Sequence, residues 1–205
     1  MDLSSLIQTI GYLGLFLMIY AESGLFFGFF LPGDSALFTA GVLASAGYFN
    51  IWILCPLLFV AAVLGDSTGY AFGIRMGPRI FTKEDSLIFR KSHLERARTF
   101  FAKHGPRSIV LARFIPAGRT FVPILAGVGE MPYRTFLIYN IVGAVLWALG
   151  LPLLGFWLGN TIPDIDTYLL PIILLIILLS LFPALFAYFR GRGSKHASVS
   201  AEERL

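Results

Sequence analysis

The chain has 205 residues, of which 57% are hydrophobic and 14% are charged. Ordinary soluble domains are about 25% charged, and a soluble fold of this size would have too few polar side chains to cover its surface. The composition excludes a soluble globular domain, a disordered chain and a disulfide-built secreted module. It predicts an all-α integral membrane protein with one membrane domain over 1–189 and a disordered basic tail over 190–205.

Four stretches are long enough and apolar enough to be transmembrane helices. A helix needs about 20 apolar residues to cross the hydrocarbon core of a bilayer, and each stretch is free of charge over most of its length. The first starts near Leu6, and the others cover Ile51–Ile74, Phe136–Leu158 and Tyr168–Phe189.

Basic residues set the orientation of these spans. Nine of the 16 lysines and arginines lie in the segment 75–107, and four more follow the last span. The positive-inside rule places both stretches in the cytoplasm, which predicts cytoplasmic N- and C-termini. Within the first stretch, Lys83–His104 has apolar residues at helical spacing on one face, among them Leu87, Leu94 and Phe101. We expect it to be an amphipathic helix on the cytoplasmic membrane surface.

Two further apolar segments do not fit as through-going helices. They cover about 22–46 and 106–130, and proline and glycine interrupt both. These residues break helices in mid-segment, and broken backbone at membrane depth is tolerated where it is buried in protein or faces water. A hairpin that enters and returns also keeps the orientation of the neighbouring spans. We therefore predict two re-entrant helical hairpins that enter from opposite faces.

An internal repeat supports this interpretation. Phe30-Leu31-Pro32-Gly33-Asp34 resembles Phe114-Ile115-Pro116-Ala117-Gly118-Arg119, and Ala40-Gly41-Val42 resembles Ala126-Gly127-Val128. Interrupted hydrophobic segments at matching positions of two halves are typical of transporters with a central site. The pattern predicts an inverted repeat.

Ionisable residues at predicted membrane depth are the candidate site. Each costs about 2.5–3.5 kcal/mol at a helix centre unless it pairs or meets water. The arginine fork suits phosphate, so two arginines are predicted to bind a phosphate group. Burial favours the protonated form of a carboxyl group, so two acids are predicted to exchange a proton. These are Arg113 and Arg119 for phosphate, and Glu22 and Asp34 for the proton.

A buried ion-pair set that only holds the hairpins together is the structural alternative. Two secondary candidates accompany the four residues. Asp66 lies among small residues that allow close helix packing, and could pair with an arginine or face a cytoplasmic cavity. Asn140 could bond across helices. His93 and His104 lack metal-ligand spacing, and no nucleotide or metalloprotease motif is present, so no metal or cofactor is predicted. Membrane topology explains the basic residues, so no nucleic-acid partner is predicted.

An ordered set of motifs resembles the DedA family, prokaryotic membrane proteins of the SNARE-associated or VTT-domain superfamily. The likeness runs from about Gly11 to Gly159. It rests on Glu22 ahead of Phe30–Asp34, on Gly65-Asp66 before Gly69-Tyr70, on Arg113-Phe114-Ile115-Pro116 before Arg119, and on Ala126-Gly127, Met131, Phe136, Asn140, Gly143-Ala144 and Trp147. The chain departs from the family at Gly73-Ile74-Arg75, where members often have glycine directly before arginine.

The resemblance implies two opposed re-entrant hairpins and an inner-membrane location. It also implies lipid translocation, with undecaprenyl phosphate or phospholipids as substrates and proton coupling. By matching position, the essential acids of the family fall on Glu22 and Asp34, and its essential arginines fall on Arg113 and Arg119.

Together these observations predict a proton-linked flippase or scramblase for an anionic phospholipid or polyprenyl phosphate, and not an enzyme. A proton-coupled transporter of small ions is the alternative, and a membrane lipid phosphatase is a weaker one. The expected partners are membrane lipids and protons, and the sequence leaves homo-oligomer formation open.

Overall fold

In the computed structural model of the protein, the described residues are 3–24, 33–80 and 105–162, with Thr99, Phe101 and Pro171 as single positions. Within these ranges the chain forms helices and no strand, which confirms the all-α prediction. The helices are α1 (Leu3–Gly24), α2 (Gly33–Ser45), α3 (Ile51–Ile80), α5 (Arg107–Ala112), α6 (Pro116–Val128), α7 (Tyr133–Ala144), the π-helical η2 (Val145–Leu149) and α8 (Gly150–Thr161).

Two helical runs are long and apolar enough to cross a membrane. They are Ile51–Met76 in α3 and Tyr133–Thr161, which joins α7, η2 and α8. Both agree with spans predicted from the sequence. The predicted span near Leu6 falls on α1. The predicted span Tyr168–Phe189, the amphipathic helix and the tail 190–205 lie outside the described residues, apart from the single positions named above.

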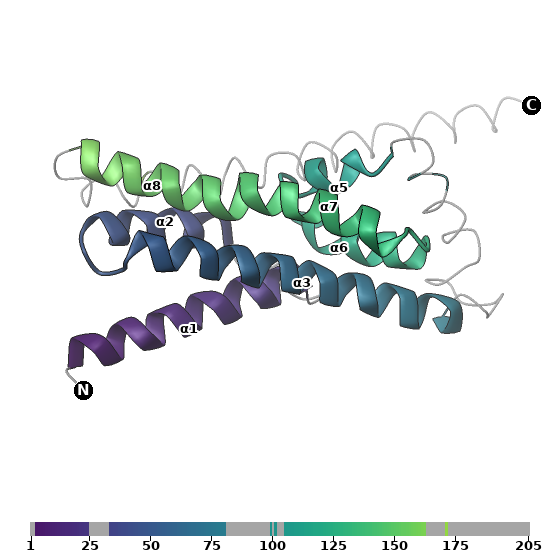
Figure 1. Cartoon of the computed structure of the whole chain (residues 1–205), viewed down its shortest axis with the longest axis horizontal. Coiled ribbons are helices and arrows are strands. Elements are labelled where there is room, and N and C mark those ends of the chain that lie inside the picture. The colour runs from purple at the N-terminus through teal and green to yellow at the C-terminus, as the bar shows by residue number, and fades with distance from the viewer. Residues whose placement is uncertain are drawn as a thin grey trace, which may run out of the picture.

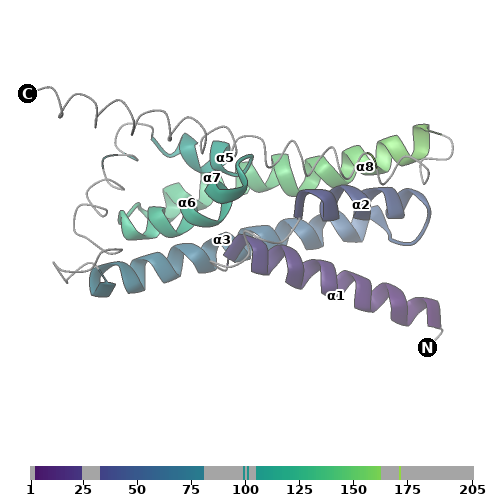
Figure 2. The same cartoon turned by 180° about the vertical axis from the view of Figure 1, so that it is seen from behind.

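The two long runs lie side by side along the molecule and are antiparallel (Figure 1). The short helix α2 packs against α8 at one end, and α6 packs against α3 at the other end. Helix α1 crosses α3 obliquely, as both Figure 1 and the reverse view in Figure 2 show. The two short helices therefore occupy opposite ends of the bundle, each against the long run of the other half.

Glycines bring each short helix against its long partner. A Cβ atom on any of four glycines would overlap a backbone carbonyl oxygen of the facing helix. The contacts of α2 with α8 are Gly41 on Pro152 and Gly155 on Phe38; those of α6 with α3 are Gly127 on Tyr70 and Gly73 on Ile124.

These two interfaces match one another position by position. In every helix the two contact residues are three apart, and Gly41 and Gly127 are the glycines of the repeated Ala-Gly-Val motif. The two interfaces therefore use the same arrangement of contact positions.

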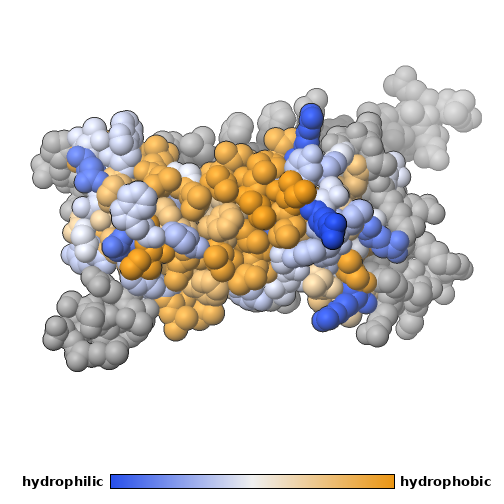
Figure 3. Space-filling model, in the orientation of Figure 1, coloured by the Kyte–Doolittle hydropathy of each residue, from blue (hydrophilic) through white to orange (hydrophobic). Residues whose placement is uncertain are grey.

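The core and the outer surface are both apolar. Leu37, Leu54 and Leu58 are fully buried where α1, α2 and α3 meet. Large apolar side chains such as Trp52, Leu111 and Trp157 are exposed. Figure 3 shows hydrophobic residues gathered across the middle of one face, with hydrophilic residues towards both ends. An exposed apolar surface of this kind suits contact with lipid chains.

Candidate functional site

Arg119 joins the first half of the chain to the second. It lies in the first part of α6 and is buried. Its Nη1 donates to Asp34 Oδ1 at 2.7 Å, and its Nη2 donates to Glu22 Oε1. Glu22 lies near the end of α1 and Asp34 in the first turn of α2. We call Glu22, Asp34 and Arg119 the Arg119 set.

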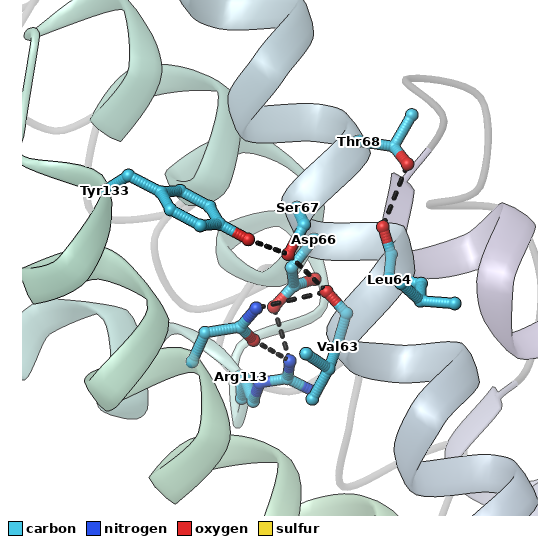
Figure 4. A network of polar contacts seen from close by, with 8 residues as sticks. Val63, Leu64, Asp66, Ser67, Thr68, Arg113 and Tyr133 are labelled. Atoms are coloured by element: carbon cyan, nitrogen blue, oxygen red, sulfur yellow. Dashed lines mark hydrogen bonds and ion pairs between the residues drawn. The ribbon is translucent and has the colours of Figure 1, made fainter.

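Arg113 forms a second buried set with residues of the two long runs. It follows α5 directly, and its Nη2 donates to Asp66 of α3 and to Asn140 Oδ1 of α7. Asn140 Nδ2 in turn donates to the backbone carbonyl of Val63 at 3.2 Å. Figure 4 shows Arg113 and Asp66 pointing towards one another, with Tyr133 reaching Ser67 nearby. We call Asp66, Arg113 and Asn140 the Arg113 set.

A break between α5 and α6 separates the two arginines. Ile115 has extended backbone and Pro116 starts the next helix, where a proline lacks only an N–H that would have no partner in the helix. Arg113 thereby lies at the end of one helix and Arg119 in the beginning of the next. Both arginines reach the interior of the bundle because the chain turns between them.

Two glycines make room for the charged side chains. A Cβ at Gly33 would overlap the Glu22 carboxylate, and the Gly33 N–H donates to Glu22 Oε1 at 3.2 Å. A Cβ at Gly143 would lie 2.7 Å from Cδ of Arg113. Any larger residue at either position would displace a member of the site.

Trp147 lies between the two sets, and the sequence reasoning gave it no role. Its indole N–H donates to Asp34 Oδ1 at 2.7 Å. The guanidinium carbon of Arg119 is 4.3 Å from the ring centroid, and that of Arg113 is 5.9 Å away. Both distances are within the range of cation–π attraction. The signal in the sequence that could have indicated this role is a tryptophan on an apolar helix, because a buried indole N–H needs a hydrogen-bond partner.

The structure brings all six predicted site residues together, but pairs them unevenly. Glu22 and Asp34, the acids predicted for the first hairpin, both form ion pairs with Arg119. Arg113 pairs with Asp66, which the sequence offered as one of two alternatives for that acid. Asn140 bonds across helices, as suggested for it. The two secondary candidates are therefore the partners of one of the two primary arginines.

Three carboxylates face two guanidinium groups in these sets, so the described site has one excess negative charge when every group is ionised. Several buried polar atoms there have no hydrogen-bond partner among the described residues. They are Glu22 Oε2, Asp66 Oδ1, Arg113 Nε and Nη1, and Arg119 Nε. Such atoms are costly in a dry interior, and a hydrogen bond to water or to a polar ligand would offset that cost. Among the described residues, no group of three His, Cys, Asp or Glu side chains is placed to hold a metal ion.

An apolar cavity lies on the opposite side of η2 from the charged site. It has a volume of about 570 Å³ and lies between α3 and the run η2–α8. Val145 and Leu149 of η2 line it, whereas Trp147 between them is buried against the charged residues. π-Helical segments of this kind are frequent at functional sites. One short segment thus has the charged site on one side and an apolar cavity on the other.

Comparison with known proteins identifies relatives along most of the chain. The family model of the VTT domain matches residues 31–157. An uncharacterized membrane protein of Mycobacterium leprae is 44% identical over 188 residues, which cover 92% of this chain and 84% of that protein. Protein DedA of Escherichia coli is 42% identical over 180 residues, 87% of this chain and 82% of its own length.

The inner membrane protein YqjA of Escherichia coli is 36% identical over 151 residues, 73% of this chain and 68% of that protein. No solved structure matches the chain. The family match spans more than half of the chain, and the identities extend over most of it. The chain therefore belongs to the DedA family of membrane proteins, as its motifs predicted.

Proposed function

We propose that this membrane protein moves an anionic lipid headgroup between leaflets, with undecaprenyl phosphate or an anionic phospholipid as substrate. The observation that carries the proposal is the pair of buried arginines, whose guanidinium groups have nitrogens that no described residue bonds, inside an apolar bundle. Arginine binds phosphate through a planar array of donors and stays protonated. Arg113, with two such nitrogens, is the principal phosphate ligand, and Arg119 is the second.

The apolar cavity favours a lipid over a soluble ion. A lipid needs a polar site for its headgroup and an apolar surface for its chains, and η2 has one on each side. A transporter of small ions needs only the first. The cavity lies between the two runs that qualify as membrane spans, so it is accessible to hydrocarbon chains in the bilayer.

Proton linkage follows from the charge balance of the site. A phosphate entering beside three carboxylates adds negative charge to a site that already has an excess of it. Protonation of Glu22 or Asp34 offsets this charge and loosens the hold of these acids on Arg119. By linkage, protonation and anion binding then favour one another, so affinity for the anion rises as pH falls.

We further propose that the α5–α6 segment and the segment ending in α2 are re-entrant hairpins. The two short helices begin near the charged residues and pack on long helices at opposite ends of the bundle. Rocking of one repeat against the other around a fixed site would expose the arginines to each leaflet in turn. The transport involves no covalent chemistry.

The test is reconstitution of the purified protein in liposomes with an acid gradient. Fluorescent undecaprenyl phosphate or phosphatidylglycerol is placed in one leaflet, and a membrane-impermeant quencher reports its sidedness. Movement that depends on Arg113 and accelerates towards low pH supports the proposal. Flux of a soluble anion without lipid movement would support the small-ion transporter, and release of inorganic phosphate would support a phosphatase; either result would overturn it.

A further inference from the structure

We propose that Trp147 is a positioning residue that couples the Arg119 set to the Arg113 set, so that a change of charge in one alters the other. The hydrogen bonds of Arg113 described above go to Asp66 and Asn140, and those of Arg119 go to Glu22 and Asp34. The indole lies within cation–π distance of both guanidinium groups.

Two contacts fix the indole in place. Its N–H and Nη1 of Arg119 donate to the same oxygen, Oδ1 of Asp34, each at 2.7 Å. The same guanidinium group lies over the ring face at 4.3 Å. Asp34, Arg119 and Trp147 thus form a closed triangle, and a shift of any one corner moves the other two.

The second set lies at the far side of this triangle. The Arg113 guanidinium is 5.9 Å from the ring centroid and has two nitrogens without a partner. An anion bound there would weaken the pull of Arg113 on the ring, and protonation of Asp34 or Glu22 would free Arg119 on the other side. The titratable groups and charges involved are Glu22, Asp34, Asp66, Arg113 and Arg119.

The local helix geometry supports a positioning role over simple packing. Trp147 lies in the middle of η2, with its side chain buried, while Val145 and Leu149 face the cavity. A leucine could fill much of the same space, but it would provide neither the N–H for Asp34 nor a ring face for the arginines. The inference concerns the coupling of charges within the proposed lipid site. Of its two tests, the transport test rests on the proposed function.

The first test uses the fluorescence of Trp147 and needs no transport. The chain has three tryptophans, and the other two, Trp52 and Trp157, are 85% and 61% exposed. The variant Trp52→Phe/Trp157→Phe in phosphatidylcholine liposomes leaves Trp147 as the only indole of the sample. Asp34→Asn, which changes a direct contact, sets the reference spectral shift.

Asp66→Asn is the decisive variant in this background, because Asp66 contacts Arg113 and belongs to the other set. We expect it to shift the emission of Trp147, whereas Arg75→Gln, at an exposed position, leaves it unchanged. A spectrum of Asp66→Asn that matches the Arg75→Gln control would overturn the coupling. Arg113→Lys, which keeps the positive charge, provides the same test should Asp66→Asn not fold.

The second test measures lipid transport in Trp147→Phe and Trp147→Leu. Phenylalanine keeps a ring over Arg119 but loses a hydrogen bond to a charged group, so we expect transport about tenfold slower or more. Leucine loses both contacts and should transport more slowly still. Wild-type rates in Trp147→Leu would refute the positioning role. Failure of the wild-type protein to move lipid would refute the proposed function alone, since the fluorescence test stands without it.

Discussion

Neutralising Asp66 should destabilise the protein more than neutralising Asp34. Asp66 and Arg113 form a buried pair with side chains about 1% exposed, and Asp66→Asn leaves the Arg113 charge without an acid partner. Removing one partner of a buried pair costs about 3–5 kcal/mol. A loss of 1 kcal/mol lowers the melting temperature by about 2–4 °C in a chain of this size, so we expect a decrease of roughly 6–20 °C.

Asp34→Asn provides the matched comparison. Asp34 is 21% exposed, and Arg119 keeps Glu22 as a partner after the substitution. The charges of the Arg119 set are then balanced, and what is lost is the negative charge of the oxygen to which Arg119 and Trp147 donate, for which we expect about 1.5–3 kcal/mol. The double variant Asp66→Asn/Arg113→Gln removes both charges of the other pair and should regain much of the stability lost by Asp66→Asn.

Thermal unfolding in detergent, followed by circular dichroism, measures these differences. Equal shifts for Asp66→Asn and Asp34→Asn, or additive losses in the double variant, would refute the assignment of Arg113 and Asp66 as a buried ion pair. The comparison uses stability alone and does not depend on which molecule is transported.

Three further predictions follow from the site and its packing. Arg113→Lys and Arg119→Lys should each impair lipid transport at least tenfold, because a point charge does not replace the planar donor array; wild-type transport in both would contradict phosphate binding by these residues. Glu22→Gln should weaken the acceleration of transport at low pH, and an unchanged pH profile would exclude this acid from proton linkage. Gly155→Ala and Gly127→Ala should each lower the free energy of unfolding by about 1–3 kcal/mol, because the added methyl group overlaps a facing carbonyl. Gly14→Ala is the control, because its methyl group meets open space. Equal effects at all three positions would refute the close helix contacts.

Much of the site was predictable from the sequence because charge in an apolar chain is conspicuous. Glu22, Asp34, Arg113 and Arg119 had to find partners or water at membrane depth, and the structure pairs all four. Which acid meets which arginine was not predictable, since it depends on where α5 ends relative to α3. Asp66 was therefore a secondary candidate although it is the ion-pair partner of Arg113.

The packing of the repeats shows a different limit. Hydropathy identified α3 and the run α7–α8, because length and composition suffice for a membrane span. The repeated motifs around Gly41 and Gly127 indicated two related segments. The motifs did not indicate that each segment packs on the long helix of the other half, because contacts between small residues leave no periodic hydrophobic pattern. Trp147 was missed because its role depends on neighbours from other helices.

The reciprocal packing has a consequence for how the chain is made. Helix α2 completes its glycine contacts only with α8, which begins at Gly150, more than a hundred residues later. Synthesis proceeds from the N-terminus and segments fold as they emerge. Helix α2 therefore remains in the translocation machinery or the bilayer without its partner until α8 is synthesised. The first half therefore cannot complete its packing before the second half is synthesised. A ribosome stalled before α8 would leave a product in which Asp34 and Gly41 lack their final neighbours.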